Sequence, residues 1–260
     1  MLITQELIDR AVTKKPYFRT VRQLFDGSYS NNGFMAYIKD PSFAPGADDD
    51  IRSFLIIQKR FIEILEYVEP AEDNEKTYSL QLRNLLMMIC TEVEANLKSI
   101  MKSNGYTKQG FTPKDWTMKD YRKVNQSHRL SEYKVYLPYW KGSNMRQPFK
   151  NWNSKKDNLT WYKAYNDTKH SRGDNLSEAN LGNVVEAMSG LMALISAQYY
   201  TINPSEPDYL IAEMGYSNHE HAIGNYFSVE FPDFPIEERY NLDITYTNNE
   251  PHKFQEYNYI

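Results

Sequence analysis

A chain of 260 residues with 41% hydrophobic and 25% charged residues has the composition of a globular protein, and its formal net charge of −4 gives no general tendency to bind polyanions. The single cysteine, Cys90, excludes an intramolecular disulfide and a cysteine-based zinc cluster and favours a reducing compartment such as the cytoplasm. We find no signal peptide, no apolar stretch of about 18 residues, and no motif of phosphate loops, dinucleotide folds, serine hydrolases or zinc proteases, so we expect no membrane span, no cofactor and none of those activities.

Three segments repeat apolar residues at helical spacing. Residues 48–68 begin with three aspartates, which suit a helix N-terminus, and residues 76–103 run without Gly or Pro. Residues 176–200 place apolar side chains on one side and include Gly190, a small residue that allows close helix approach. These helices predict a mainly α fold, a helical bundle.

Three short segments instead alternate apolar and polar residues, as β-strands do. They are residues 133–137, 227–231 and 242–246. If they pair, Lys134 faces Glu230 or Asp243 across the sheet. The pattern predicts a small accessory antiparallel β element.

The remaining segments indicate the domain organisation. Residues 139–158 are rich in Asn, Lys, Ser and Pro, as is typical of a long surface loop. Residues 201–260 are acidic and aromatic, too hydrophobic for a free tail and too interrupted by proline for a helix. We predict a bundle domain over residues 1–200, followed by an extended C-terminal segment, residues 201–260, packed on it.

Charge is distributed unevenly along the chain. Residues 114–172 hold 14 Lys and Arg against 5 Asp and Glu, whereas residues 201–260 hold 2 against 11. In one interpretation the acidic tail folds back onto the basic middle. In the other, the basic segment binds single-stranded nucleic acid, with phosphate contacts and stacking on its aromatic residues, which are Trp116, Tyr121, Tyr133, Tyr136, Trp140, Trp152, Trp161 and Tyr162.

A fourth helix is predicted from residue 159 to Arg172, just before Gly173. At about 100° per residue, it gathers an inner set of side chains on one face and places Asn166 and His170 on the opposite one. The inner set is Trp161, Ala164, Tyr165 and Thr168.

The segment from Trp161 to Arg172 resembles the Trp-x-x-Tyr-Asn-x-x-Lys-His-x-Arg pattern of helical bacterial proteins in the HEPN (higher eukaryotes and prokaryotes nucleotide-binding) superfamily. Arg83-Asn84-Leu85-Leu86 and Cys90-Thr91-Glu92-Val93-Glu94 resemble the preceding long helix of such proteins. The resemblance covers residues 76–200 and implies a helical bundle that dimerises. It also implies metal-independent ribonuclease activity from an arginine and a histidine four to six residues apart.

Residue by residue, the resemblance places the catalytic histidine at His170 and the polar residue after the arginine at Asn166. The arginine position itself holds Tyr165, which has a hydroxyl but no positive charge. Lys169 or Arg172 of the same helix, or a second copy of the chain, are the alternative sources of the cation. Another pair with this spacing, Arg122 and His128, lies in a segment with no clear helical pattern.

The residues alone support a similar site. Asn166 and His170 are four apart on one helix face, so the amide can orient the imidazole while Lys169 holds a phosphate. The alternative is that His170 only caps a helix C-terminus and Asn166 belongs to a structural hydrogen-bond network. The side chains expected to contact nucleic acid are Arg172, Lys163, Trp161, Tyr165, Arg122 and Lys123.

Other polar residues are interpreted as structural. Glu92 and Asn96 flank the apolar stripe of helix 76–103, and Asn96 is expected to find a buried partner in Asn166, His170 or Tyr165. His219 and His221 would share one face of a strand, with His252 as a remote third ligand, but this spacing is insufficient for a metal site, so we expect no metal.

The sequence therefore predicts an RNA-binding or nucleotide-binding protein, with His170, Asn166 and Lys169 as candidate catalytic residues. The resemblance adds a prokaryotic defence or toxin-like setting, a homodimer, and a partner such as an antitoxin. The alternative is a non-catalytic protein-interaction or dimerisation module in which Tyr165 marks a degenerate site.

Overall fold

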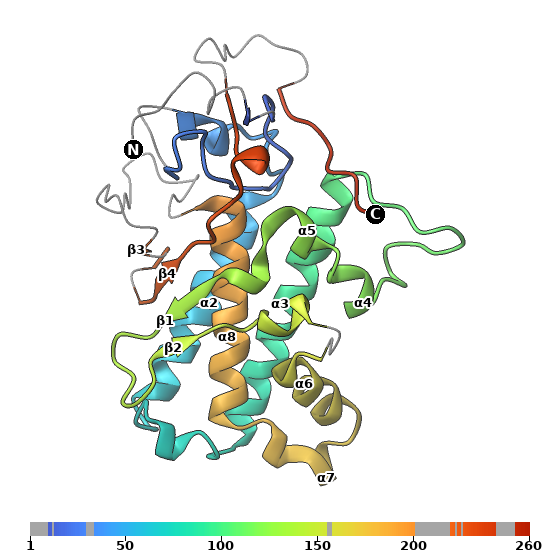
Figure 1. Ribbon diagram of the computed structural model, residues 1–260. Coiled ribbons are helices and arrows are strands. Elements are labelled where there is room, and N and C mark those ends of the chain that lie inside the picture. The colour runs from blue at the N-terminus through green and yellow to red at the C-terminus, as the bar shows by residue number, and fades with distance from the viewer. Residues whose placement is uncertain are drawn as a thin grey trace.

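The computed structural model describes residues 10–11, 13–29, 34–154, 158–200, 219–221, 223–224, 226–242 and 253–260. Helices dominate and a small antiparallel sheet lies beside them, so the predicted fold class is confirmed (Figure 1). Within this described part of the chain, no helix is long and apolar enough to cross a membrane.

Three long helices form the core of the bundle, α2 (Ala47–Leu65), α3 (Leu80–Ser103) and α8 (Leu181–Tyr199). The Ser79 hydroxyl caps α3 by accepting a hydrogen bond from the Leu82 amide at 3.1 Å, so α3 begins four residues later than the predicted 76–103. Asn180 caps α8 in the same way, accepting from the Asn183 amide at 3.0 Å.

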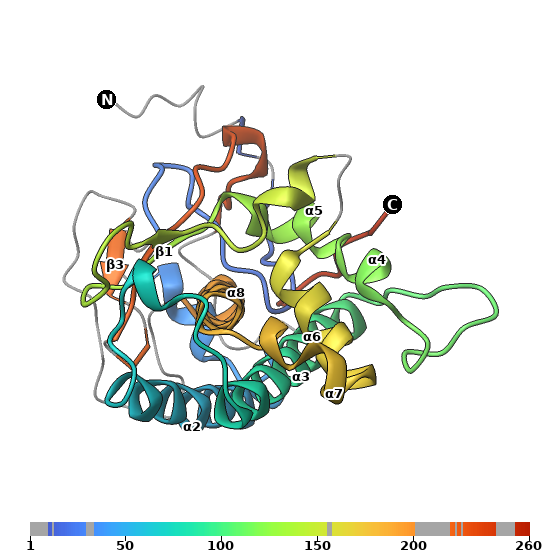
Figure 2. The ribbon, with the colours of Figure 1, turned by 90° about the horizontal axis from the view of Figure 1, so that it is seen from below.

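Helix α8 runs through the centre of the molecule, with α2, α3, α6 and β1 around it (Figure 2). Sixteen of its 19 residues are buried, so the prediction of a single apolar side was too narrow, because neighbours cover α8 on every side. Gly190 has the predicted role, since a Cβ atom there would lie 3.2 Å from the Trp161 ring.

Shorter elements connect these helices. The predicted fourth helix is α6 (Thr160–His170), and a separate turn, α7 (Arg172–Asn175), follows it. The other helical elements are α4 (Met118–Tyr121), α5 (Val124–His128), and the 3-10 turns η1 (Phe34–Lys39), η2 (Glu72–Asn74), η3 (Leu130–Glu132), η4 (Lys150–Asn153), η5 (Leu176–Glu178) and η6 (Ile236–Glu238).

The sheet has the strand order β2-β1-β4-β3, with β1 at Lys134–Tyr136, β2 at Met145–Arg146, β3 at His219–His221 and β4 at Ser228–Glu230. Strands β1 and β4 confirm two of the three predicted strands, and Lys134 stands opposite Glu230, with an ion pair of 2.7 Å. Most of the third predicted strand, residues 243–246, lies outside the described residues. Strand β2 falls inside the predicted 139–158 loop, where it pairs with β1.

The described parts of the N-terminal and C-terminal segments meet at one end of the bundle (Figure 1). Short bridges join Tyr17 to Gln255 and Leu24 to Tyr240. The guanidinium of Arg22 is buried among aromatic rings and lies 5.0 Å from the centroid of the Tyr17 ring. The described part of the acidic aromatic extension therefore packs against the N-terminal segment as well as the helices.

Candidate functional site

Helix α6 divides into the two faces that its sequence predicts. Trp161, Ala164, Tyr165 and Thr168 are all buried, whereas Asn166 is half-buried and His170 is exposed. Lys163 and Lys169 are also exposed. The residues expected to carry chemistry therefore face solvent, on a helix fixed from its other side.

Packing fixes the inner face of α6. The Trp161 indole nitrogen donates to the Pro148 carbonyl at 3.1 Å, and its ring lies against Gly190 of α8. At the other end of α6, the Arg83 guanidinium of α3 donates to the Thr168 carbonyl at 3.2 Å. Helices α3 and α8 thus hold both ends of α6.

The lysine of the motif reaches back to Tyr165. The Lys169 ammonium lies 3.2 Å from the Tyr165 hydroxyl and 5.1 Å from the ring centroid. The hydrogen bond to Tyr165 raises the pKa of Lys169, which stays positively charged at neutral pH. Next to this ring, Tyr162 donates to Glu94 of α3 at 2.8 Å, and burial raises the pKa of Tyr162.

The histidine and asparagine of the motif remain separate. Among the described residues, no hydrogen bond joins Asn166 to His170, so the predicted orientation of the imidazole is absent from this structure. Lys163 forms an ion pair with Asp167 on the same helix. The side chain of Arg172 lies outside the described part of the chain.

The predicted supporting residues belong to a different cluster. The Gln198 amide of α8 donates to Asn96 at 2.8 Å, and Asn96 in turn donates to Glu92 at 2.9 Å. The expectation that Asn96 contacts α6 was therefore wrong, because the central helix α8 supplies its partner. The Arg19 guanidinium extends this cluster, donating to Gln198 at 2.9 Å and to Asp50 of α2 at 2.7 Å.

This buried network could not be predicted from the sequence. Its members come from the N-terminal segment, α2, α3 and α8, and residues 19 and 198 are 179 positions apart. Burial of the Arg19 charge costs desolvation energy, and the hydrogen bonds with these charged and polar partners offset this cost. The arrangement fixes the mutual positions of the three long helices and offers no open surface for a ligand.

Several residues predicted to contact nucleic acid are unsuited to that role in this structure. Trp161 is 1% exposed and Tyr165 4%, so neither ring can stack on a base. Arg122 donates to the Trp152 carbonyl at 3.0 Å, and Lys123 to the Ile260 oxygen at 2.7 Å. Trp116, Tyr121, Tyr133, Trp140 and Trp152 are buried as well. These seven aromatic residues of the basic segment are part of the core, whereas Tyr136 and Tyr162 are half-buried.

The histidine of the second arginine and histidine pair is also internal. The His128 side chain is fully buried, with Nδ1 2.7 Å from the Ser127 hydroxyl and Nε2 2.9 Å from the Arg19 carbonyl. The Tyr259 hydroxyl lies 3.0 Å from the same serine oxygen. Burial lowers the pKa of His128 to about 3, so the imidazole is neutral and its role is to join α5 to the two ends of the chain.

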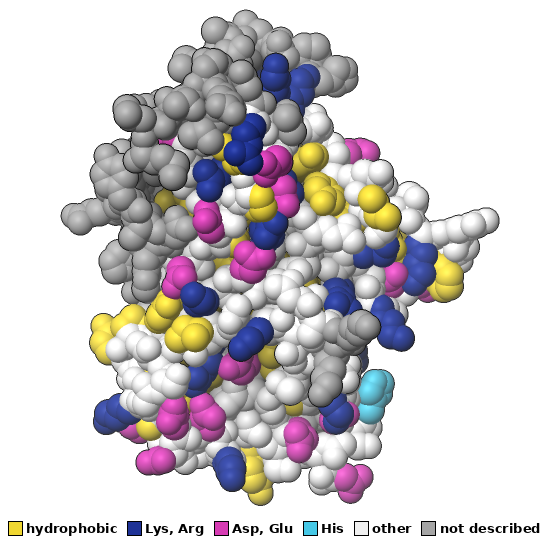
Figure 3. All heavy atoms as spheres, in the orientation of Figure 1, with side chains coloured by type: hydrophobic (Ala, Val, Ile, Leu, Met, Phe, Trp, Pro, Cys, Tyr) yellow, Lys and Arg dark blue, Asp and Glu magenta, His cyan; other side chains and the backbone are white. Residues whose placement is uncertain are grey.

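Contacts between the acidic tail and the basic middle support the first interpretation of the charge pattern. Glu230 pairs with Lys134, and Glu238 with Arg129 at 2.8 Å. Figure 3 shows Lys and Arg interspersed with Asp and Glu over one face of the molecule, without a continuous basic field.

The described residues contain no group of three or more His, Cys, Asp or Glu side chains arranged to hold a metal ion. The side chains of His219 and His221, and all of His252, lie outside them. Comparison of the chain with protein-family models, with curated proteins and with solved structures finds no match. What the protein does must therefore be inferred from the geometry of its surface.

Proposed function

We propose that the protein binds RNA or a nucleotide through the exposed side of α6, as its resemblance to the HEPN superfamily implies. The observation that supports this proposal is the position of the Lys169 ammonium, 3.2 Å from the Tyr165 hydroxyl. The superfamily has its catalytic arginine at the position of Tyr165, which carries no charge. The ammonium of Lys169 lies beside the Tyr165 hydroxyl and supplies a positive charge there. A lysine can hold a phosphate as a point charge, although without the two-pronged grip of arginine.

Three motif residues occupy one side of the helix. At 3.6 residues per turn, Lys169, Asn166 and His170 fall within an arc of about 100°. In the proposed reaction, the imidazole of His170 accepts the proton of a ribose 2′-hydroxyl while the 2′-oxygen attacks the adjacent phosphorus, and the 5′-oxygen leaves as a hydroxyl with a proton from solvent water. Lys169 balances the charge on the phosphate, Asn166 orients the imidazole once RNA is bound, and no step needs a metal ion.

The biological setting of the proposal comes from the resemblance alone. It is a prokaryotic defence or toxin-like system in which two copies of the chain pair and a partner protein such as an antitoxin restrains them. In a pair of this kind, the second copy can supply a further cation to His170.

Binding is tested by fluorescence anisotropy with a labelled single-stranded RNA at several KCl concentrations. We expect Lys169→Gln to weaken binding about tenfold, the loss of one charge-assisted hydrogen bond, and to lower the salt dependence by about one ion. Lys59→Gln is the matched control, because Lys59 is an exposed lysine of α2, on another side of the bundle. Equal affinities for the Lys169 variant and the wild type would overturn the proposal.

Cleavage is tested separately, with purified protein and RNA in EDTA. We expect His170→Ala to abolish cleavage while RNA binding is retained. Cleavage by both proteins at the same rate, or by neither, contradicts the catalytic role of His170 and leaves the binding measurement to decide whether α6 is a binding face.

A non-catalytic interaction module is the second candidate, and a separate surface supports it. Tyr139, within the turn between β1 and β2, is 70% exposed, and Met145, the first residue of β2, is 38% exposed. The Tyr139 ring lies 5.9 Å from that of Tyr226. Figure 3 shows apolar side chains gathered over this hairpin. Exposed tyrosine and methionine favour protein contacts. Tyr139→Ser would then abolish self-association in sedimentation measurements and leave RNA binding unaffected.

A further inference from the structure

Arg83, in the first turn of α3, reaches the C-terminal end of α6. Its guanidinium donates to the Thr168 carbonyl, from Nε at 3.4 Å and from Nη2 at 3.2 Å. Thr168 directly precedes Lys169, and α6 ends at His170. The guanidinium of Arg83 therefore lies at the helix end that carries the lysine and the histidine of the candidate site.

The charge of Arg83 exceeds what the end of α6 needs. The last carbonyl groups of an α-helix have no partner within the helix and carry a partial negative charge. Neutral donors serve the carbonyl of Asp167, which accepts from the Ser171 amide and from the Asn175 side chain. A neutral donor would equally serve the next carbonyl, that of Thr168, where the chain places a guanidinium.

Arg83 has no counter-ion in the part of the chain that the structure describes. There, no carboxylate lies within ion-pair distance of its guanidinium, and its Nη1 has no hydrogen-bond acceptor. Two carboxylates of the neighbouring helices are engaged elsewhere. Asp167 pairs with Lys163, and Glu94 accepts from the Tyr162 hydroxyl at 2.8 Å.

The other described arginines that are not exposed differ from Arg83 in their partners. Each of them is held by a carboxylate or by two carbonyl groups of the chain. They are Arg19, Arg22, Arg122, Arg129, Arg146 and Arg239. Arg83 has a single carbonyl group as its partner, and its unpaired Nη1 is accessible to solvent.

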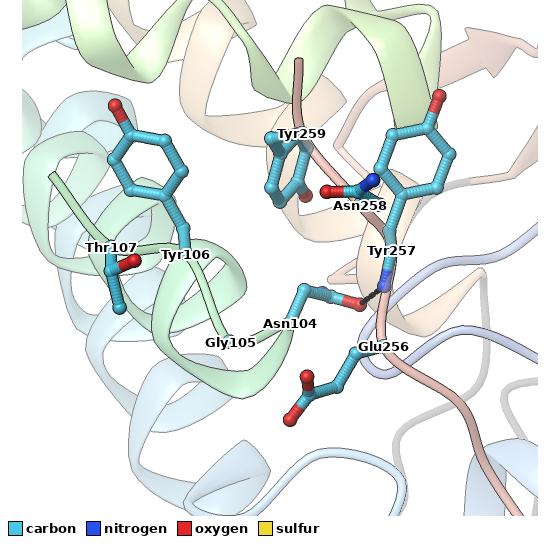
Figure 4. Close-up of a pocket in the computed structure, with 8 residues that line it drawn as sticks. All are labelled: Asn104, Gly105, Tyr106, Thr107, Glu256, Tyr257, Asn258 and Tyr259. Atoms are coloured by element: carbon cyan, nitrogen blue, oxygen red, sulfur yellow. Dashed lines mark hydrogen bonds between the residues drawn. The ribbon is translucent and has the colours of Figure 1, made fainter.

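A hollow of about 330 Å³ at the other end of α3 offers a phosphate no such group. Figure 4 shows Tyr106 and Tyr257 on opposite sides of it, with the Glu256 carboxylate below them. The cations nearby already lie against these rings, with Lys123 5.8 Å from the Tyr106 centroid and Arg22 5.5 Å from the Tyr257 centroid. An anion entering this hollow would also meet the carboxylate, so the end of α6 is the better anion site.

We propose that Arg83 supplies the guanidinium that the motif lacks at Tyr165 and contacts a phosphate of the RNA or nucleotide bound at α6. The inference rests on the proposed function and adds to Lys169 a second cation from a different helix. Because Nε and one N–H of Nη2 are bonded to Thr168, the fork formed by Nη1 and the second N–H of Nη2 remains. Such a fork binds two phosphate oxygens, whereas lysine acts as a point charge.

The test is fluorescence anisotropy with a labelled single-stranded RNA at several KCl concentrations. Glutamine at position 83 can still donate to the Thr168 carbonyl but has no charge. We expect Arg83→Gln to weaken binding about tenfold and to lower the salt dependence by about one ion. Arg83→Lys retains the charge and should retain the wild-type salt dependence. Arg60→Gln, a change at an exposed arginine of α2, is the matched control and should bind like the wild type.

Lys169→Gln, measured in parallel, separates this inference from the proposed function. Weaker binding by Lys169→Gln together with wild-type affinity of Arg83→Gln overturns the inference and leaves RNA binding by α6 intact. Wild-type affinity of both variants overturns both proposals. Equal losses of affinity in Arg83→Gln and Arg83→Lys, at an unchanged salt dependence, would show that Arg83 only holds the end of α6, and would also overturn the inference.

Discussion

Neutral, buried His128 makes the stability of this protein depend on pH in a way that can be measured. Burial, more than the nearby Arg22 charge, lowers its pKa from 6.5 to about 3 in the folded state. The unfolded chain therefore binds one more proton than the folded chain between these values, and stability falls as pH decreases below 6.5. The slope approaches about 1.4 kcal/mol per pH unit well below pH 6.5, so this one group destabilises the fold by about 2 kcal/mol on going from pH 6.5 to pH 4.5.

The assay is urea unfolding of the wild type and His128→Gln between pH 7 and pH 4.5. The glutamine amide can still donate to the Arg19 carbonyl but does not titrate in this range. We expect the wild type to lose its advantage over the variant by about 1.4 kcal/mol per pH unit below pH 6.5. Burial raises the pKa of Glu92 and of Glu186, which opposes this trend, and taking the difference between two proteins cancels that effect.

A matched control is Ile56→Gln, a change at an exposed position of α2 that carries no titratable group and should not alter the slope. Parallel stability curves for the wild type and His128→Gln over this pH range would refute the reasoning, because they would mean that His128 takes up its proton as easily in the folded chain as in the unfolded one.

Three further changes test the packing, each followed by urea unfolding at pH 7. Asn96→Leu leaves an amide hydrogen of Gln198 without its partner and should cost about 1–3 kcal/mol, whereas a change below about 0.5 kcal/mol would mean that the network relaxes freely. Gly190→Val forces a side chain against the Trp161 ring and should cost about 1–3 kcal/mol, and an unchanged stability would contradict the close contact of α6 with α8. Ser79→Ala removes the cap of α3 and should cost about 1 kcal/mol, so a neutral result would show that the first turn is held by packing alone.

What the sequence could predict depended on local periodicity. The apolar spacing located α2, α3 and α8 within a few residues, and the period of two located β1 and β4 together with the Lys134 to Glu230 pairing. The division of α6 into a buried and an exposed face followed from the same geometry. In each case the pattern lies within one element or across one strand pair.

The features that escaped prediction join distant segments. Asn96 finds its partner 102 residues away in Gln198, and the Tyr17 backbone bridges to Gln255, so no spacing within a helix could reveal either contact. The sequence of a basic segment does not distinguish a tryptophan that stacks on bases from one that fills a core. Trp161 belongs to the core because its ring packs against α8. The residues of the candidate site share one helix, so spacing alone places them on a common face, whereas the buried network joins separate segments and could not be predicted in this way.

The charge pattern now distinguishes between the two regions that could bind a polyanion. Arg129 and Lys134 are paired with tail glutamates, so a phosphate there would have to displace an existing ion pair and gains little from the exchange. Lys169 contacts only the neutral hydroxyl and ring of Tyr165 among its described partners, so a phosphate can approach it without breaking an ion pair. The modest net charge of the chain is therefore compatible with a local anion site on α6. If the protein binds nucleic acid, we expect the affinity to depend on Lys169 more than on Arg129 or Lys134.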